Sequence, residues 1–451
     1  VTDQAGNTAT ATDNFIYDPV ASINADLASP ALDDGVLNAA EVAAGVDLSG
    51  TVTGIEGGRV LDVEITDQSG NSVTTTATVS GDQSLDGVNN WALDGVDLTA
   101  LADGELTMTL TGTDIAGNEA TQTFTFDKDT EATITARFED AQVFEGNTGI
   151  LNDAEDDATV LSGTVSNVEA GDDVNLTVTD TQGGQLTFVT QVQGDGTWST
   201  TEDLSSLAPG TLTLTADTVD NAGNPASATA NIEHDPNAVI TVIFLDQGDV
   251  INADESLATV VNGTVTDVEP GRTVQVEITD GVTTVTTTAQ VQGDLSWSAD
   301  PADLSGLADG PITINVSVFD NAGNEATNSY PATKDATAEI TVMFEDDFIN
   351  DGFGGYLNAD EDDATTVSGT VTDVEDGQTV DVVITDSAGI EVTGSATVAG
   401  GAWSLDNLDL SGLEEGPLTV SATVTDQAGN PVSASDDIIH DTLASIDDTV
   451  Q

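Results

Sequence analysis

The chain of 451 residues has no cysteine and almost no positive charge: five Lys and Arg residues stand against 81 Asp and Glu residues, for a formal net charge of −76. Without cysteine, neither a disulfide nor a thiolate metal site can hold the fold together. So large a negative excess repels nucleic acid and anionic lipid, which excludes both as partners. No apolar run approaches membrane-spanning length and no signal peptide is visible, so we expect no direct membrane insertion.

Aromatic residues are also scarce, at 4%, and acidity with few aromatics can indicate a disordered chain. Disorder is the weaker interpretation here, because 38% of the residues are hydrophobic and they fall in alternating runs of Val, Ile, Leu and Thr. Such alternation is typical of half-buried strands, and helix is scarcely indicated anywhere. The sequence therefore predicts an all-β fold.

The chain repeats itself at intervals of about 100 residues, the size of one small β-sandwich. Each repeat has one Trp, an Asp-x-Ala-Gly-Asn pentapeptide, and an isolated Asp 15 residues after the start of that pentapeptide. Short alternating strands and regular turns predict tandem seven-stranded immunoglobulin-like sandwiches in an extended rod. The pentapeptides start at Asp3, Asp114, Asp220, Asp320 and Asp426, the isolated Asp residues are Asp18, Asp129, Asp235, Asp335 and Asp441, and the tryptophans are Trp91, Trp198, Trp297 and Trp403.

This period sets the predicted domain boundaries. The chain starts at Val1 rather than at a Met and ends within the pattern, so we expect it to be part of a longer array with loosely ordered ends. The predicted segments are 1–18 (last strand of a preceding repeat), 19–128, 129–234, 235–334 and 335–441 (repeats 1 to 4), and 442–451 (start of a following repeat). In repeat 3 we expect strands A to G at 240–245, 259–266, 273–279, 284–291, around Trp297, 312–319 and 325–332.

Carboxylates are expected to gather at the N-terminal pole of each sandwich, where the linker meets the B–C and F–G loops. The isolated linker Asp would lie beside the Asp that opens the pentapeptide and beside the Glu of a Val-Glu or Ile-Glu pair. Crowded carboxylates repel one another, and a hard cation such as calcium, which takes six to eight oxygens, relieves that repulsion. The predicted calcium ligands are Asp18, Glu56 and Asp114; Asp129, Glu169 and Asp220; Asp235, Glu269 and Asp320; Asp335, Glu375 and Asp426; and Asp441.

The C-terminal pole of the preceding repeat offers further candidate ligands to the same junction. They are the Glu of an Asn-x-x-Glu box (Glu41, Glu155, Glu255, Glu361) and the Asp at the end of strand C (Asp67, Asp180, Asp280, Asp386). Simpler interpretations stay open for all these residues. Asp and Asn suit tight turns, a strand-end Glu is often only solvated, and the box resembles a local cap. Neither an EF-hand loop nor the glycine-rich calcium nonapeptide is present.

Two other repeated positions are not interpreted as functional sites. The residue before the linker Asp is Tyr, Lys or His, so it is not a metal ligand, and both His234 and His440 drop out as metal or catalytic candidates. We expect this long side chain to lie along the junction. One Trp at a fixed strand position predicts core packing rather than sugar stacking.

The order Asn-x-x-Glu, Ser-Gly-Thr-Val, Val-Glu-x-Gly, Trp-Ser, Asp-Leu-Ser-Gly-Leu, Asp-x-Ala-Gly-Asn and linker Asp resembles the bacterial immunoglobulin-like repeats of giant adhesins. These include the extender repeats of ice-binding and biofilm adhesins of the RTX type, which are exported by type I secretion. The resemblance implies extracellular, calcium-rigidified repeats that hold a ligand-binding tip away from the cell. The linker Asp, the F–G Asp and the B–C Glu would be the ligands, and neighbouring repeats of one monomeric rod the partners.

Two other functions compete with the spacer. A carbohydrate- or protein-binding module would use the long A–B loops of repeats 2 and 4, at 144–149 and 348–355, with Phe353 and Tyr356 as candidate contacts. An enzyme such as a glycosidase needs a dedicated carboxylate pair. No acid/base pair stands outside the repeated scheme, whereas an active site is usually a single asymmetric constellation. We therefore expect no catalysis.

Overall fold

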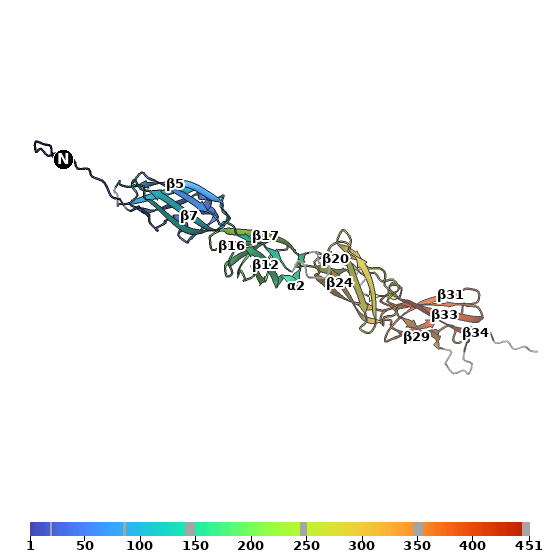
Figure 1. Ribbon diagram of the computed structural model, residues 1–451. Helices are drawn as coiled ribbons and strands as arrows, with labels where there is room; N and C mark the ends of the chain where they lie inside the picture. The colour runs from blue at the N-terminus through green and yellow to red at the C-terminus, as the bar shows by residue number, and fades with distance from the viewer. Residues whose placement is uncertain (19, 84–86, 140–148, 244–249, 346–354, 444–451) are drawn as a thin grey trace, which may run out of the picture. The chain divides into compact units, whose positions relative to one another are not determined.

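The computed structural model describes residues 1–18, 20–83, 87–139, 149–243, 250–345 and 355–443. The chain divides into two compact units, Val1–Pro236 and Asn237–Gln451, and each unit holds two of the predicted repeats. Strands make up nearly all the regular structure, and each repeat folds as a β-sandwich, as Figure 1 shows. The predicted all-β, immunoglobulin-like class is thereby confirmed.

Repeat 1 closes its strands into one eight-stranded sheet, in the order β1-β3-β6-β5-β4-β7-β8-β2. The sheet is continuous because strands D and E pair with each other, with Thr78 opposite Ala92. Its elements are β1 (Ser22–Ile23), η1 (Pro30–Leu32), β2 (Val36–Leu37), α1 (Ala39–Ala44), β3 (Val46–Thr53), β4 (Val60–Thr66), β5 (Ser72–Ser80), β6 (Val88–Val96), β7 (Gly104–Thr113) and β8 (Glu119–Lys128).

Repeat 2 forms two separate sheets. Strands A, B and E make one, in the order β10-β12-β15 with β9 also on β12, and strands D, C, F and G make the other, in the order β14-β13-β16-β17-β11. The short β11 is an addition to the predicted seven strands, and it runs parallel to strand G. The elements are β9 (Thr133–Ile134), β10 (Arg137–Phe138), β11 (Ile150–Leu151), α2 (Asp153–Asp156), β12 (Thr159–Ser166), β13 (Asp173–Thr179), β14 (Gln185–Gln191), β15 (Thr197–Glu202), β16 (Gly210–Val219) and β17 (Pro225–His234).

Repeats 3 and 4 have the same two-sheet arrangement. Repeat 3 comprises β18 (Val239–Ile243), β19 (Val250–Ile251), α3 (Ala253–Ser256), β20 (Asn262–Thr266), β21 (Thr273–Thr279), β22 (Thr284–Gln290), β23 (Ser296–Ser298), β24 (Gly310–Phe319) and β25 (Glu325–Lys334). Repeat 4 comprises β26 (Glu339–Ile340), β27 (Met343–Phe344), β28 (Tyr356–Leu357), β29 (Thr365–Thr372), β30 (Thr379–Thr385), β31 (Glu391–Thr397), β32 (Ala402–Leu408), β33 (Gly416–Thr425) and β34 (Pro431–His440).

The strands predicted in repeat 3 lie close to the observed ones. Strand C has the predicted bounds, and strand F begins two residues earlier, at Gly310. Strand B begins three residues later than predicted, because Thr259 makes only an isolated bridge to Ala302. The last two residues of predicted strand A lie outside the described residues.

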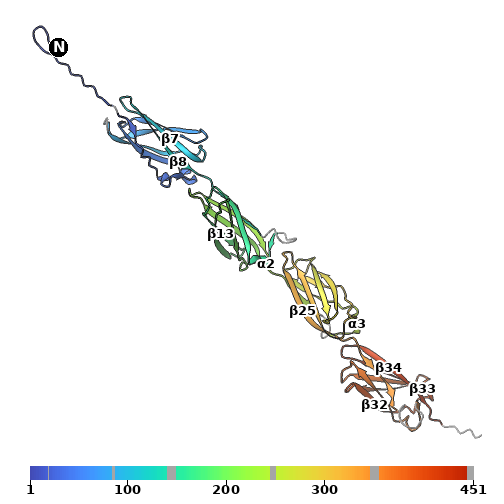
Figure 2. The ribbon, with the colours of Figure 1, turned by 60° about the horizontal axis from the view of Figure 1, so that its bottom comes forward.

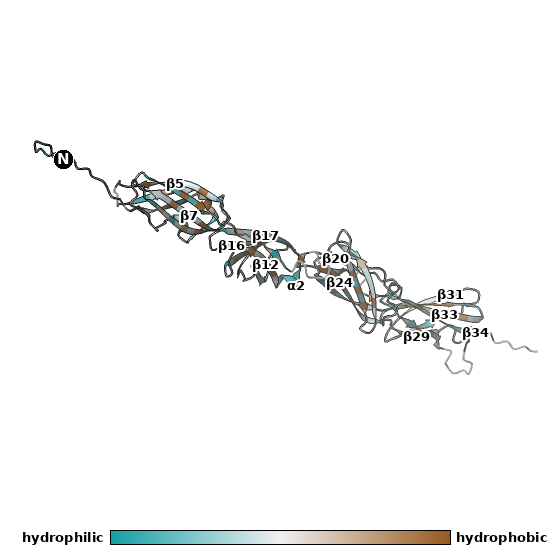
Figure 3. Ribbon diagram, viewed as in Figure 1, coloured by the Kyte–Doolittle hydropathy of each residue, from teal (hydrophilic) through white to brown (hydrophobic). Residues whose placement is uncertain are grey.

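Four hydrophobic clusters form the cores, and each lies wholly within one predicted repeat. Hydrophobic and hydrophilic residues alternate along the strands, as Figure 3 shows. In strand F of repeat 3, Ile312, Ile314, Val316 and Val318 are buried, as their spacing predicts. Each fully buried aliphatic side chain contributes about 1.5–3 kcal/mol to folding.

The four tryptophans lie in these cores, which confirms the predicted packing role: the most exposed, Trp403, is only 3% exposed. The packing also explains the Gly of the Gly-Thr-Val stretch. A Cβ on Gly163 would lie 1.9 Å from the Thr135 carbonyl oxygen and 2.6 Å from the Trp198 indole. Only glycine lets strands A and B and the indole approach so closely.

The helices are short caps after strand A, and α2 and α3 each lie at one end of their sandwich in Figure 2. None of the described helices has the length or apolarity to cross a membrane. Residues 1–18 form a small turn, bridged from Thr2 to Thr8, followed by an exposed extended segment. Most of the expected following repeat, 444–451, lies outside the described residues.

Candidate metal centre at the N-terminal pole of each repeat

The Asp that opens each pentapeptide shapes the F–G turn. Asp220 Oδ1 accepts from the Asn224 amide N–H at 2.8 Å, and its Oδ2 accepts from Asn224 Nδ2 at 2.7 Å. The same turn forms at Asp3, outside any sandwich, where Oδ1 accepts from the Asn7 N–H at 2.8 Å. The turn interpretation is thus confirmed, because five residues suffice to make these bonds. Asp114, Asp320 and Asp426 bond alike.

Hydrogen bonding dominates the protonation of this turn Asp. Burial alone would raise the pKa of Asp114, but the side chain and backbone N–H of Asn118 outweigh it and lower that pKa. Asp114 is therefore an ionised, buried carboxylate at neutral pH.

The Glu of the Val-Glu pair is brought to the same loop. Glu56 Oε2 accepts from the N–H of Ile115, the residue after the turn Asp, at 3.0 Å. The other repeats make the same bond, from Glu169 to Asn221 (3.2 Å), from Glu269 to Asn321 (2.9 Å) and from Glu375 to Gln427 (2.9 Å). Each Glu thus ties the B–C loop to the F–G loop with one oxygen, rather than being merely solvated.

The linker Asp is anchored by its backbone. The pentapeptide Asn donates from Nδ2 to the linker carbonyl oxygen, from Asn118 to Asp18 at 2.7 Å, from Asn224 to Asp129 at 2.9 Å and from Asn430 to Asp335 at 2.8 Å. The linker carboxylate is thereby held at the loops. In repeats 1, 2 and 4 the linker Asp and the turn Asp are thus bonded to the same Asn, and their role as metal ligands stays a prediction.

Crowding of negative charge is visible at two linkers. Burial, and then the negative charges of Asp220, Asp103 and Glu169, raise the pKa of Asp129. At the equivalent position, burial followed by the charges of Asp426 and Glu375 raises the pKa of Asp335. These are the effects that a bound cation would remove.

Repeat 1 shows carboxylate oxygens without protein partners. Within the described residues, Asp18 Oδ2 and Glu56 Oε1 are buried and accept no hydrogen bond, and Glu56 as a whole is 2% exposed. A buried carboxylate oxygen without a partner is costly, so these atoms fit a cation. The donors are all oxygens, the set preferred by calcium and magnesium.

The side chains do not enclose an ion in the described arrangement. Across the part of the chain that the structure describes, no three His, Asp or Glu side chains converge as a metal site requires. Their oxygens point partly into the loop bonds described above. The N-terminal pole thus contains the residue types of a metal site, but their oxygens do not converge on one point in the described residues.

The strand-C Asp has both oxygens occupied at the C-terminal pole. Asp67 Oδ1 accepts from the N–H groups of Ser69 and Asn71, and Oδ2 accepts from the Ala102 N–H at 2.9 Å and from Asn71 Nδ2 at 2.8 Å. The bond from Ala102, followed by that from Asn71, lowers the pKa of Asp67 to about 2. This Asp ties the C–D turn to the E–F loop. Asp180, Asp280 and Asp386 do the same.

The Asn-x-x-Glu box is a local cap, which confirms the simpler interpretation. Glu41 Oε2 accepts from the Asn38 N–H at 2.9 Å, and Asn38 Oδ1 accepts from the Glu41 N–H at 3.0 Å. Boxes at Asn152 and Asn252 are reciprocal in the same way, and Asn358 donates to Glu361. A capping box stabilises the start of a short helix.

Where the residue before the linker Asp is Lys or His, it is buried at the C-terminal pole and pairs with an acid, whereas Tyr17 is exposed. Lys128 Nζ donates to Asp103 at 2.7 Å and to the Leu101 carbonyl at 2.8 Å. His234, fully buried, lies 3.0 Å from Asp156. Lys334–Asp309 and His440–Asp362 follow the same two patterns. The sequence carried this signal: Lys occurs with an Asp one residue before the Gly that opens strand F, and His with an Asp four residues after the box Asn.

The pentapeptide Asn was not among the predicted site residues. Besides holding the linker, Asn224 Oδ1 accepts from the backbone N–H of Ala39, in the box of repeat 1, at 2.8 Å. Asn430 accepts from Ala253 of repeat 3 at 2.7 Å. Its occurrence in all five pentapeptides is the signal that could have identified it.

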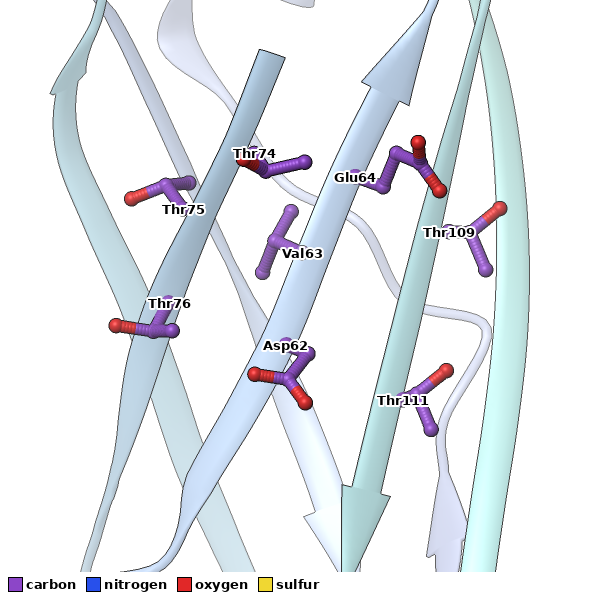
Figure 4. A pocket seen from close by; sticks show the side chains of 8 residues that line it. All are labelled: Asp62, Val63, Glu64, Thr74, Thr75, Thr76, Thr109 and Thr111. Carbon is purple, nitrogen blue, oxygen red and sulfur yellow. The ribbon is translucent and has the colours of Figure 1, made fainter. Parts of the chain in front are cut away.

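A hollow also lies on the open sheet face of repeat 1. The hollow has a volume of about 480 Å³ and lies over strands C, D and F. Figure 4 shows the side chains that line it, which are Asp62, Val63, Glu64, Thr74, Thr75, Thr76, Thr109 and Thr111. These eight residues include neither an aromatic platform nor a cation. The long A–B loops lie outside the described residues, except for Gly149 and Gly355 at their ends, and Tyr356 is 48% exposed.

Comparison with known proteins places the chain beside adhesin repeats. A tetra-tandem repeat from the extending region of a large adhesion protein is 29% identical, over 94% of this chain and 99% of that one, with a TM-score of 0.41. A Ca²⁺-stabilised adhesin with which an Antarctic bacterium binds ice is 30% identical over the same shares, with a TM-score of 0.34. A segment of a 1.5-MDa bacterial ice-binding adhesin is 29% identical over 69% and 98%, with a TM-score of 0.33.

No family model and no curated protein matches the sequence. The relationship rests on sequence identity, which extends over nearly the whole of both chains. It does not rest on how well the complete chains superpose.

Proposed function

Because this chain belongs to the extender repeats of large bacterial adhesins, we propose that it is a spacer whose junctions are stiffened by calcium bound at the N-terminal pole of each repeat. The observation that supports the calcium part is the pair of buried oxygens without protein partners, Asp18 Oδ2 and Glu56 Oε1. Both belong to one predicted trio. A repeated structural unit without an individual active site fits a non-enzymatic role.

Each part of the trio has a distinct task in this proposal. The linker Asp provides a carboxylate from the segment between repeats, and the B–C Glu provides the oxygen that the F–G loop leaves unused. The turn Asp adds negative charge from the F–G loop. Bound calcium supplies positive charge that offsets the repulsion and joins linker to loops. The ligands would be Asp18, Glu56, Asp114, Asp129, Glu169, Asp220, Asp235, Glu269, Asp320, Asp335, Glu375 and Asp426, with Asp441 leading to the next repeat.

Calcium would also stabilise each repeat, because it binds the assembled pole and not the unfolded chain. An ion present at 100 times its Kd adds about 2.7 kcal/mol to the free energy of unfolding. A chain without disulfides could then stay unfolded where calcium is scarce and fold after export. We place the protein outside the cell, exported by type I secretion as a monomeric rod that carries a binding tip.

Small-angle X-ray scattering with calcium and then with excess EGTA tests this function. We expect a longer maximum dimension and a narrower spread of conformations with calcium, together with a higher melting temperature. Magnesium at equal concentration is the control, because it demands a smaller, near-octahedral site. An identical scattering curve and melting temperature in calcium and EGTA would refute the calcium role and leave the fold assignment intact.

A further inference from the structure

The junction inside each unit contains a contact made by protein atoms alone. Asn224 Oδ1 accepts from the Ala39 N–H at 2.8 Å, and Asn430 Oδ1 accepts from the Ala253 N–H at 2.7 Å. The first contact joins repeat 2 to repeat 1, and the second joins repeat 4 to repeat 3. The same atoms thus meet in two separate units of the chain.

The Asn side chain is fully used by this arrangement. While its oxygen accepts from the preceding repeat, Asn224 Nδ2 donates to the Asp129 carbonyl at 2.9 Å and to Asp220 Oδ2 at 2.7 Å. One planar carboxamide therefore connects the F–G loop, the linker and the preceding box. Asn224 is 3% and Asn430 5% exposed, whereas Asn118, which has no preceding box in this chain, is half-buried.

The turn glycine lies in contact with the preceding box, and its positive φ favours glycine at this position. Gly223 has a φ of 95°, and a Cβ placed there would lie 3.4 Å from Asn38 Nδ2 of the preceding box. Gly429 repeats this with a φ of 98° and a distance of 3.5 Å to Asn252 Nδ2. Asn252 Nδ2 also donates to the Ala428 carbonyl at 3.3 Å. The box and the pentapeptide thus fit each other along their backbones.

We propose that the box is a socket for the pentapeptide loop of the next repeat, and that the pentapeptide Asn is the latch that sets the orientation of the two repeats without calcium. The partner of this surface is another repeat that carries Asp-x-Ala-Gly-Asn. The latch rests on the proposed spacer function but not on its calcium sites, because none of its bonds between repeats uses a carboxylate. It gives the junction inside each unit a preferred orientation even in metal-free conditions.

The socket of repeat 4 has the same composition as an occupied one. Around Asn252 and Ala253 in repeat 3, a hollow of about 410 Å³ is bordered by Gly429 and Asn430 of repeat 4. At the end of repeat 4, a hollow of about 320 Å³ is lined by Asn358, Ala359, Asp360, Asp441, Thr442 and Leu443. This second hollow is the surface where the pentapeptide of a following repeat would dock.

The substitution Ala39→Pro tests the latch with little disturbance elsewhere. Ala39 is exposed and is the first residue of α1, a position that suits Pro, and Asn38 before it is extended with a ψ of 173°. Proline removes the N–H that donates to Asn224 across the junction. It changes no proposed calcium ligand. Ala359→Pro is the matched control, because it makes the same change in the box of repeat 4, where no further pentapeptide follows in the chain.

Distances across the first junction give the readout. Since the chain has no cysteine, Thr76→Cys in β5 and Thr187→Cys in β14, both at exposed positions, allow spin labels to be placed in repeats 1 and 2 of the full chain. Electron–electron double resonance in EGTA should show a main distance in the parent protein. With Ala39→Pro, the ratio of molecules at that distance to molecules at all other distances should fall about fivefold. This is the change expected when one hydrogen bond with a net contribution of about 1 kcal/mol is lost. Ala359→Pro should leave it unchanged.

The outcomes separate the latch from calcium. An unchanged distribution for Ala39→Pro in EGTA would overturn the latch, whatever calcium does. A parent distribution that calcium does not narrow would refute the calcium sites and leave the latch standing. Should Ala39→Pro unfold repeat 1, Ala253→Pro with labels in repeats 3 and 4 replaces it, and an unchanged distribution there overturns the proposal equally.

Discussion

Replacing Gly163 with Ala should break the core of repeat 2 at a defined point. The added Cβ would lie 1.9 Å from the Thr135 carbonyl oxygen, a backbone atom, and 2.6 Å from the Trp198 indole. Neither neighbour is the flexible end of a side chain, so strand A must move away from strand B. Trp198 Nε1 donates to that same carbonyl at 3.1 Å, and this bond is lost when the strands separate.

The expected cost follows from these two effects. Overpacking a core costs about 1–3 kcal/mol, and a buried hydrogen bond adds about 1 kcal/mol. For a repeat of this length, each kcal/mol lowers the melting temperature by about 4–8 °C, so repeat 2 should melt about 10 °C earlier or more. Gly194→Ala is the control in the same repeat, because nothing lies within 4 Å of its Cβ position.

Calorimetry of the full chain measures the shift, and hydrogen exchange with mass spectrometry assigns it to repeat 2. The other three repeats should keep their protection, since each has its own core. If Gly163→Ala melts with the parent protein while Gly194→Ala does too, the close contact between strand A, the glycine and the indole is wrong. The explanation of the Gly-Thr-Val stretch would then fail with it.

Three further predictions concern charge. Asp335→Asn should raise the melting temperature of repeat 4 in EGTA, because burial and then the charges of Asp426 and Glu375 raise the pKa of Asp335 and disfavour its ionised form. With calcium, the same variant should melt at a lower temperature than the parent protein. A melting temperature below that of the parent in both buffers would contradict this prediction. In EGTA, the stability of repeat 1 should be constant above about pH 4 and fall towards pH 2. The pKa of Asp67 is lowered from 3.8 to about 2 in the folded protein, and its hydrogen bonds are lost as the carboxylate is protonated. A melting temperature, measured by circular dichroism, that stays the same between pH 4 and pH 2 would refute this. His234→Lys should destabilise repeat 2 by about 1–3 kcal/mol by leaving Asp156 buried without its partner, and adding Pro209→Asp should recover part of this loss in urea titrations by recreating the Lys128–Asp103 pair.

The sequence predicted the fold well because alternation and period are local signals. Strand C of repeat 3 has its predicted bounds, and the inward face of strand F is buried residue by residue. The short parallel strand after strand A escaped prediction, because two residues such as Ile150 and Leu151 carry no readable alternation. The closure of repeat 1 through pairing of strands D and E depends on how long those strands are, which turn signals do not fix.

The sequence predicted which loops meet at the N-terminal pole of a repeat, but not the hydrogen bonds that join them. The linker Asp, the B–C Glu and the turn Asp do share one pole, as their loop positions imply. Their bonds could not be foreseen, since backbone N–H groups carry no sequence signature. The sequence left open whether the box Glu41 caps its own helix or binds a metal, and it gave no sign that loop amides would occupy both oxygens of Asp67. The pentapeptide Asn was missed for the same reason, as its partner is a backbone amide of another repeat.

The short strand beside strand G governs how a repeat responds when it is pulled. In repeat 2, β17 leads directly into the linker and is flanked by β16 on one side and by the parallel β11 on the other. Asp235, just past the strand, still donates its N–H to the Leu151 carbonyl at 2.9 Å. A force applied along the linker therefore loads all these hydrogen bonds at the same time, in shear, and does not break them one after another. We therefore expect a repeat to unfold in one step at high force, without gradual extension beforehand.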